Sequence, residues 1–214
     1  MLVRIATHWA DRRDALGIRE FTYNKGNKIY GENEPAEDVY QVRTGTVRRY
    51  KVLSDGRRQI GAFHLPGDIF GLENGDAFRF SAEAVVDTAV CLIRRRGLEA
   101  VAEADPLVFH NLLSVTTTNL QHAESHLLLL GRKYSMEKVA AFLIEMDQRL
   151  SAAGVLSLPM TRRDIADYLG VTIETVSRAV SQLHKEGILD FVDKTQRHIK
   201  ILNRARLASF DQPS

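Results

Sequence analysis

Two short helices joined at a glycine, each opened by a threonine, are the feature of this sequence that most constrains its fold. Thr161 lies where a helix N-cap belongs, and Asp164 follows three residues later in a capping-box arrangement. Gly170 lies where the first helix must end, at a position that favours left-handed backbone. Thr172 then caps a second helix, predicted to run from Ile173 to about Lys185. This layout is typical of a helix-turn-helix unit that binds DNA.

The second predicted helix separates an apolar face from a polar one. Val176, Val180 and Leu183 recur at i, i+4 and i+7 and should pack inward. The opposite face carries Glu174, Ser177, Arg178, Ser181 and Lys185. A surface helix with ordinary solvated charges is the alternative interpretation. The caps, the glycine, the apolar stripe and the polar face together favour DNA binding.

Two groups of residues are predicted to contact DNA. Glu174, Ser177 and Arg178 lie near the N-terminal end of the second helix, the part that meets base edges in the major groove. An arginine can donate two hydrogen bonds to guanine, and a glutamate can accept one from cytosine. The predicted phosphate contacts are Thr161, Arg162, Arg163, Thr172, Thr175, Ser181, Lys185 and Arg197. Between residues 161 and 200, seven Lys or Arg against six Asp or Glu leave a formal charge of only +1, so the prediction depends on where the charges point.

A family resemblance rests on these residues. Glu174-Thr-Val-Ser177-Arg178 resembles the Glu-x-x-Ser-Arg recognition motif of the CRP/FNR superfamily of bacterial transcription regulators, and within it the FNR and FixK branch. The resemblance extends through residues 158–170 and 131–143 and covers most of the C-terminal half. It implies a palindromic DNA site with TTGA-type half-sites, read by Glu174, Ser177 and Arg178.

Residues 18–94 change to short strands separated by turns. The predicted strands are Arg19–Tyr23, Val39–Val42, Thr46–Leu53, Arg57–Phe63, Ser81–Val86 and Ala89–Ile93. Asp55-Gly56, between two alternating runs, predicts a hairpin. Many short, closely spaced strands favour an antiparallel barrel or jelly roll. The segment also resembles the β-roll sensor domain of the same superfamily, notably at residues 54–60 and 65–68.

A long helix beginning near Pro106 should mediate dimerisation. Its apolar positions alternate in steps of four and three residues, as in a coiled coil. This predicted seam comprises Phe109, Leu113, Thr116, Leu120, Ala123, Leu127, Leu130 and Tyr134, with Leu113, Leu120, Leu127 and Leu130 as its leucines. One amphipathic helix lying on its own domain is the alternative. A homodimer would match a palindromic DNA site, because the two-fold symmetry of the protein would mirror that of the operator.

The predicted fold is therefore α+β with three parts. Residues 1–105 form an N-terminal antiparallel β-roll, a jelly roll like that of cyclic-nucleotide-binding domains. Residues 106–134 form the dimerisation helix, and the sensor and DNA-binding modules are expected to meet at Gly131–Tyr134. Residues 135–214 form a C-terminal winged helix-turn-helix, in which Ser135 caps a first helix and residues 152–154 lead out of it. Its wing strands are expected at Ile188–Val192 and His198–Leu202.

Three effectors can be tested against the residues, a cyclic nucleotide, an iron–sulfur cluster and haem, and no cofactor is expected. Nucleotide-binding members of the superfamily carry a Gly-Glu pair and, further on, an Arg-Ser or Arg-Thr pair that holds the cyclic phosphate. Gly67-Asp68 is similar to the first pair, but Phe80-Ser81 stands at the second, and Arg79 precedes the arginine position by one residue. In a strand, that shift turns a side chain to the other face. For an iron–sulfur cluster, Cys91 is the only cysteine, and such clusters usually need four thiolates.

Haem or metal binding has even less support in the sequence. The seven histidines are scattered, and His122 and His126, four residues apart on the long helix, are expected to lie on a solvated face. FixK-type regulators lack the cysteine cluster and act without an effector, and this matches the resemblance. The alternative is an effector-gated regulator, switched by a cyclic nucleotide, haem or a redox event.

Composition is ordinary for a soluble globular protein, and the net charge does not by itself indicate a nucleic-acid partner. The 214 residues carry a net charge of +2, with 44% hydrophobic and 26% charged residues. No apolar run approaches the ~20 residues that span a membrane, and no secretory signal is evident, so a cytoplasmic protein is expected. The strand region lacks a His-x-His pair, which argues against a jelly-roll enzyme. The resemblance implies an activator of low-oxygen respiration, denitrification or nitrogen-fixation genes. Residues 54–58 and 74–78 are candidate contacts to RNA polymerase.

Overall fold

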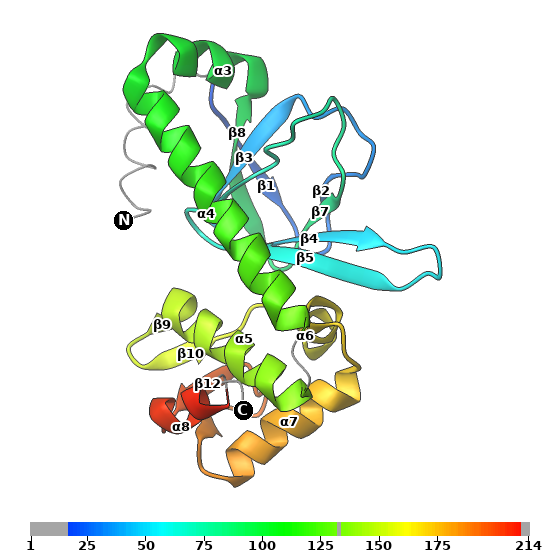
Figure 1. Ribbon diagram of the computed structural model, residues 1–214, viewed down its shortest axis with the longest axis vertical. Helices are drawn as coiled ribbons and strands as arrows, with labels where there is room; N and C mark the ends of the chain where they lie inside the picture. The colour runs from blue at the N-terminus through cyan, green and yellow to red at the C-terminus, as the bar shows by residue number, and fades with distance from the viewer. Residues whose placement is uncertain (1–16, 132–133, 211–214) are drawn as a thin grey trace. The chain divides into compact units, whose positions relative to one another are not determined.

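A computed structural model describes residues 17–131 and 134–210, and its contacts divide the chain into two compact units, Met1–Glu124 and Ser125–Ser214 (Figure 1). The first unit is an antiparallel β-roll of two four-stranded sheets. One sheet has the order β1-β8-β3-β6 and the other β2-β7-β4-β5. Its strands are β1 (Arg19–Tyr23), β2 (Lys28–Tyr30), β3 (Asp38–Thr44), β4 (Val47–Val52), β5 (Arg58–His64), β6 (Ile69–Phe70), β7 (Ser81–Ala84) and β8 (Thr88–Arg94). The predicted α+β fold with an N-terminal β-roll is confirmed. The three-part division of the chain stays a prediction.

Six of these strands coincide with predicted ones to within a few residues, and two were missed. β2 and β6 contain three and two residues, too few for a period of two to be recognised. The Asp55-Gly56 hairpin is present between β4 and β5. Gly56 has a φ of 83°, which only glycine adopts without strain, and Leu53 accepts its N–H at 2.9 Å.

Aromatic side chains fill the interior of the β-roll. Tyr30 stacks on Phe78 with ring centroids 3.7 Å apart, and Tyr40 stacks on Phe70 at 5.3 Å. All four residues are at most 5% exposed. Large rings of this kind account for much of the apolar surface that a small domain can remove from water. Cys91 on β8 is buried as well, as expected of a small hydrophobic residue.

The β-roll continues into two helices, of which only the second was predicted. α3 (Arg95–Ala104) ends where Asp105 takes up extended backbone before Pro106, as residues preceding proline prefer. α4 (Pro106–Leu130) begins there, and the Asp105 carboxylate accepts the Leu107 N–H at 2.8 Å. Leu98, Val108 and Val115 bring both helices into one apolar cluster with strand residues such as Val39 and Ile93. In the residues described, no helix is long and apolar enough to cross a membrane.

The second unit is a winged helix-turn-helix built on a four-stranded sheet of order β11-β12-β10-β9. Its elements are α5 (Ser135–Leu150), β9 (Ser151–Ala152), β10 (Val155–Ser157), α6 (Arg162–Leu169), α7 (Ile173–Lys185), β11 (Leu189–Phe191), β12 (His198–Ile201) and α8 (Arg204–Ser209). The helix-turn-helix and both wing strands are confirmed.

Two local predictions in this unit were wrong, and one helix was missed. The N-cap of α5 is Tyr134, whose N–H donates to the Glu137 carboxylate at 3.5 Å, and Ser135 is the first helical residue. Residues 152–154 belong to a β9–β10 hairpin: Ala152 pairs with Val155, and Ala153 and Gly154 form the turn with φ of 51° and 79°. The short helix α8 was not predicted. It is held by Arg204, whose guanidinium donates to both carboxylate oxygens of Asp147 at 2.7 and 3.1 Å.

Candidate nucleic-acid interface

The two helices of the helix-turn-helix begin and end where their caps require. The Thr161 hydroxyl accepts the Asp164 N–H at 3.1 Å, and the Asp164 carboxylate accepts the Thr161 N–H at 3.0 Å. This is the predicted capping box. Gly170 has φ 64° and ψ 39°, the predicted left-handed conformation. Thr172 caps α7 by accepting the Thr175 N–H at 3.2 Å.

Buried side chains hold α7 against the domain and leave its other face outward. Val176, Val180 and Leu183 are at most 1% exposed, as predicted from their spacing. Ile165 and Leu169 of α6 are buried to the same degree. Since every third or fourth residue of α7 is fixed in this core, the rotation of the helix about its axis is fixed too.

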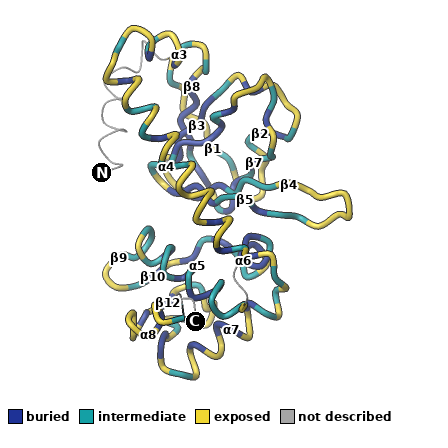
Figure 2. The backbone as a smooth tube through the Cα atoms, in the orientation of Figure 1, coloured by how far each residue is buried: buried dark blue, intermediate teal, exposed yellow. Residues whose placement is uncertain are grey.

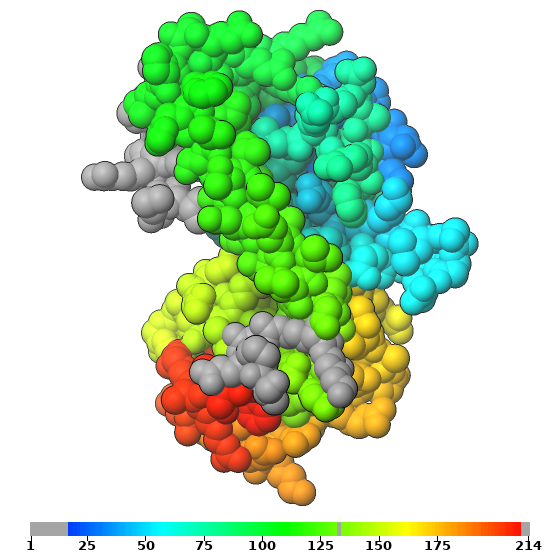
Figure 3. Space-filling view, in the orientation of Figure 1, coloured from blue at the N-terminus to red at the C-terminus, as the bar shows by residue number. Residues whose placement is uncertain are grey.

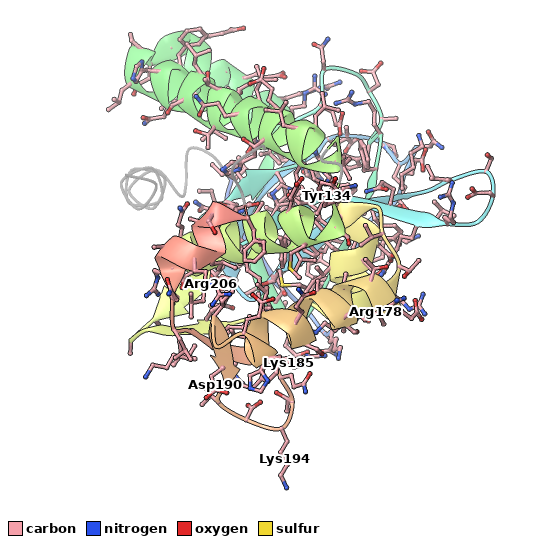
Figure 4. All side chains as sticks on the ribbon, turned by 60° about the horizontal axis from the view of Figure 1, so that its bottom comes forward. Tyr134, Arg178, Lys185, Asp190, Lys194 and Arg206 are labelled. Atoms are coloured by element: carbon pink, nitrogen blue, oxygen red, sulfur yellow. The ribbon has the colours of Figure 1, made fainter. Side chains whose placement is uncertain are left out.

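The predicted base-reading residues are all exposed on α7. Glu174, Ser177 and Arg178 lie on its solvent face, followed by Ser181 and Lys185 further along. Figure 4 shows Arg178 and Lys185 on the same helix, with their side chains directed outward. Arginine and glutamate at the N-terminal half of such a helix supply the donors and the acceptor that base edges can pair with.

Electrostatics keep the Glu174 carboxyl ionised. Its own backbone N–H and the Thr172 hydroxyl donate to it, and Arg163 and Arg178 lie close enough to attract it. Together they hold the pKa of Glu174 below its usual range. At neutral pH the ionised carboxylate can accept hydrogen bonds but cannot donate them.

The predicted phosphate contacts fall into two groups. Arg163, Thr172, Ser181 and Lys185 are exposed, whereas Thr161, Arg162, Thr175 and Arg197 are partly buried. The Thr161 and Thr172 hydroxyls already serve as caps. Burial lowers the pKa of Arg162, and its Nη1 is buried without a hydrogen-bond partner. The phosphate role of these eight residues stays a prediction.

The wing contributes a cation that the sequence interpretation missed. Lys194 is exposed at the wing turn, and its side chain extends away from the domain (Figure 4). The turn is held by Asp193, which accepts the Thr195 N–H at 2.9 Å and also bonds His198. The pattern Asp-x-Thr marks such a turn and places the middle residue at its tip. That signal could have identified Lys194.

The β-roll does not fit a cyclic nucleotide. Ser81 uses its hydroxyl to accept the Glu32 N–H at 3.0 Å, and Phe80 lies beneath the Arg49 guanidinium at 5.1 Å. The Arg79 side chain is 75% exposed and pairs with Glu73 at 2.8 Å, so it is not directed into the roll. Phe80 therefore stands where the resembled motif has its arginine, and Arg79 does not supply a guanidinium at that position.

The histidine pair on α4 corrects one prediction. His122 is exposed as expected, but His126 is buried against α6 and does not lie on a solvated face. The pair therefore cannot offer two ligands to one solvent-exposed ion. Within residues 17–131 and 134–210, no three His, Cys, Asp or Glu side chains form a group that could hold a metal.

Comparisons with known proteins agree with both units. A cyclic nucleotide-binding domain family matches residues 20–105, and a Crp-like helix-turn-helix domain family matches residues 137–210. The nitrogen fixation regulation protein FixK of Rhizobium meliloti (strain 1021) is 42% identical over 188 residues, covering 88% of this chain and 85% of that protein. The transcriptional activatory protein AadR of Rhodopseudomonas palustris is 40% identical, covering 87% and 79%. The structure of FixK2 from Bradyrhizobium japonicum is 59% identical, covers 92% of this chain and 98% of that one, and superposes with a TM-score of 0.88.

Removing the Thr172 hydroxyl should raise the pKa of Glu174. In a Thr172→Val variant the carboxylate loses one of its donors, so its pKa should move up toward the ordinary glutamate range, and an NMR titration of the carboxyl carbon can measure this. Ser177→Ala, which removes a neighbouring hydroxyl of the same helix face, should leave the titration unchanged. An unchanged Glu174 pKa in the Thr172 variant would mean that the hydroxyl does not act on the carboxylate.

Proposed function

Because the chain belongs to the CRP/FNR family of transcription regulators, we propose that it acts as a homodimer that binds a palindromic operator and activates transcription. The observation that carries this proposal is the exposed face of Glu174, Ser177 and Arg178 on a helix whose rotation is fixed by buried Val176, Val180 and Leu183. A fixed donor–acceptor set at the N-terminal half of a recognition helix is what direct readout in the major groove requires.

The target is proposed to be a palindrome of TTGA-type half-sites in genes for low-oxygen respiration, denitrification or nitrogen fixation. The names of the relatives support this range of targets, since they include nitrogen fixation regulation proteins and the fumarate and nitrate reduction regulatory protein of Vibrio cholerae, which is 32% identical. The pairing of Arg178 with guanine and of Glu174 with cytosine suits the G·C pair of such a half-site.

Dimerisation is proposed to occur along the exposed face of α4. Figure 2 shows exposed stretches along α4, and Figure 3 shows α4 on the face turned toward the viewer. Phe109, Leu113, Leu120 and Leu127 are 54–70% exposed, which leaves a stripe of apolar side chains in contact with water. Stripes of this kind usually mark an interface. Leu130 differs from the other seam leucines because it is half-buried, and a Cβ placed on Gly170 would lie 3.4 Å from its Cδ2. It would therefore contribute less to pairing than the rest of the seam.

Contact with RNA polymerase is proposed for the tip of the β4–β5 hairpin. Residues 54–57 are all exposed there. The other candidate segment, 74–78, is less suitable at its end, because Phe78 is 2% exposed and stacks within the β-roll. In that segment only residues 74–76 are open to a partner.

A titration of purified, air-exposed protein against an operator tests the proposal. We expect tight binding to a palindrome of TTGA-type half-sites with no added nucleotide, and the same affinity when cAMP is present, because Phe80 replaces the arginine that would hold the cyclic phosphate. In Arg178→Ala the specific affinity should fall by about 1–3 kcal/mol, with much less effect on random DNA. The measurement is a fluorescence anisotropy titration on both DNAs.

Lys185→Ala is the matched control for Arg178→Ala. A phosphate contact should weaken both DNAs alike and reduce the slope of log affinity against log salt by about 1. Equal losses on both DNAs in Arg178→Ala would contradict the base-reading role. A requirement for cAMP would favour the effector-gated alternative.

Charging the seam should separate the protomers. Leu127→Lys places a cation in the proposed interface, so analytical ultracentrifugation should show monomers with little operator affinity. Leu128→Lys changes the next residue, which is 73% exposed but off the seam, and should leave the dimer intact. Dimers that persist in Leu127→Lys and also in Leu120→Lys would refute the seam.

A further inference from the structure

His126 is buried although it precedes the highly exposed Leu127 in the same turn of α4. It is 8% exposed, against 70% for Leu127. Its ring lies flat on the Tyr168 ring of α6, with centroids 3.9 Å apart and planes inclined by 5°. Its Nε2 is 2.8 Å from the backbone oxygen of Tyr168, and because a carbonyl oxygen can only accept, the ring nitrogen donates.

The His126 ring supplies a hydrogen-bond donor to a carbonyl at the C-terminal end of α6. The last carbonyls of a helix have no intrahelical partner and carry partial negative charge. His126 binds the carbonyl of Tyr168, and Lys138 of α5 donates to the next carbonyl, that of Leu169, at 3.4 Å. Leu130, one helical turn after His126, leaves little room at Gly170, where an added Cβ would lie 3.4 Å from its Cδ2. Two successive carbonyls at the end of α6 are thus bound by side chains of α4 and α5.

We infer that His126 is a positioning residue that fixes the distance between the two recognition helices of a dimer. The inference rests on the proposed function. Leu127 would pair with its partner copy, while His126, its neighbour, docks the same turn onto α6. α7 follows α6 through the single turn at Gly170, so the position of the recognition helix depends on this contact. Half-sites of a palindrome lie about one helical turn, roughly 34 Å, apart, and both helices must reach them together.

His126 makes two kinds of contact with Tyr168, ring stacking and a hydrogen bond. A flat ring fills the space over Tyr168, and a donor at its edge reaches the helix carbonyl. His126→Ala removes both, and His126→Phe keeps the ring and removes the donor. Neither change touches the seam or the outward face of α7, so dimerisation and the affinity of one recognition helix for one half-site should persist.

The experiment measures affinity for palindromes whose half-sites are at the native separation or one base pair further apart, together with a single half-site. For the wild-type protein the added base pair should lower affinity by about 100-fold, because the second half-site can no longer be engaged. In His126→Ala this ratio should fall below about tenfold, with single half-site affinity within about twofold of wild type. His110→Ala, an exposed histidine of the same helix off the seam, is the control and should keep the wild-type ratio.

The outcomes separate the positioning role of His126 from the proposed binding of a palindrome by a dimer. A wild-type ratio in a folded His126→Ala variant overturns the positioning role while palindrome binding stands. If the alanine variant does not fold, His126→Phe decides in its place: a reduced ratio supports the inference, and an unchanged ratio overturns it. A wild-type protein that binds all spacings equally overturns the inference together with the proposed dimeric function.

Discussion

The packing of helix ends around Gly170 is the constraint on which the DNA-facing surface depends. The chain must leave α6 in left-handed backbone there, which a side chain would strain, and Leu130 approaches closely from α4. The direction in which α7 leaves α6 follows from this turn. The buried residues of α7 then fix its rotation, and only after both are fixed do Glu174 and Arg178 acquire defined positions. The positions of the base-reading side chains thus depend on packing at the Gly170 turn and along the buried face of α7, neither of which contacts the bases.

The helix-turn-helix could be predicted from sequence because its determinants are local. Caps, a left-handed glycine and an apolar period involve residues three or four positions apart, and Thr161, Gly170 and Thr172 all behave as expected. The elements that were missed lack such signals. β2, β6 and the β9–β10 hairpin are too short for a period, and α8 depends on Arg204 reaching Asp147, which lies 57 residues earlier. The burial of His126 depends in the same way on a contact with α6 that no local pattern encodes.

The interior of the β-roll is filled by its own aromatic side chains. The aromatic rings of Tyr30, Tyr40, Phe70 and Phe78 make the interior self-sufficient, since they bury apolar surface without any bound molecule. Phe80 supports Arg49 in a cation–π contact at the motif where a nucleotide-binding roll would carry its phosphate-binding arginine. The roll also supports α4, whose Val108 and Val115 pack into the neighbouring apolar cluster with Val39 and Ile93.

The near-neutral charge of the DNA-binding region is compatible with a basic surface because four of its six acids are already engaged. Asp164 is 2% exposed inside the capping box, Asp190 pairs with His184 at 3.1 Å, Asp193 holds the wing turn, and Glu186 binds Arg206 at 3.1 Å. Arg163, Arg178, Lys185 and Lys194 are exposed and, among the residues described, form no ion pair. Their charge is thus available to phosphates and bases, while the acids act on backbone groups and side chains of the domain itself. A net charge summed over the sequence cannot distinguish cations that face DNA from acids that bind groups of the domain itself. The direction of each side chain is therefore more informative than the total of +1 over residues 161–200.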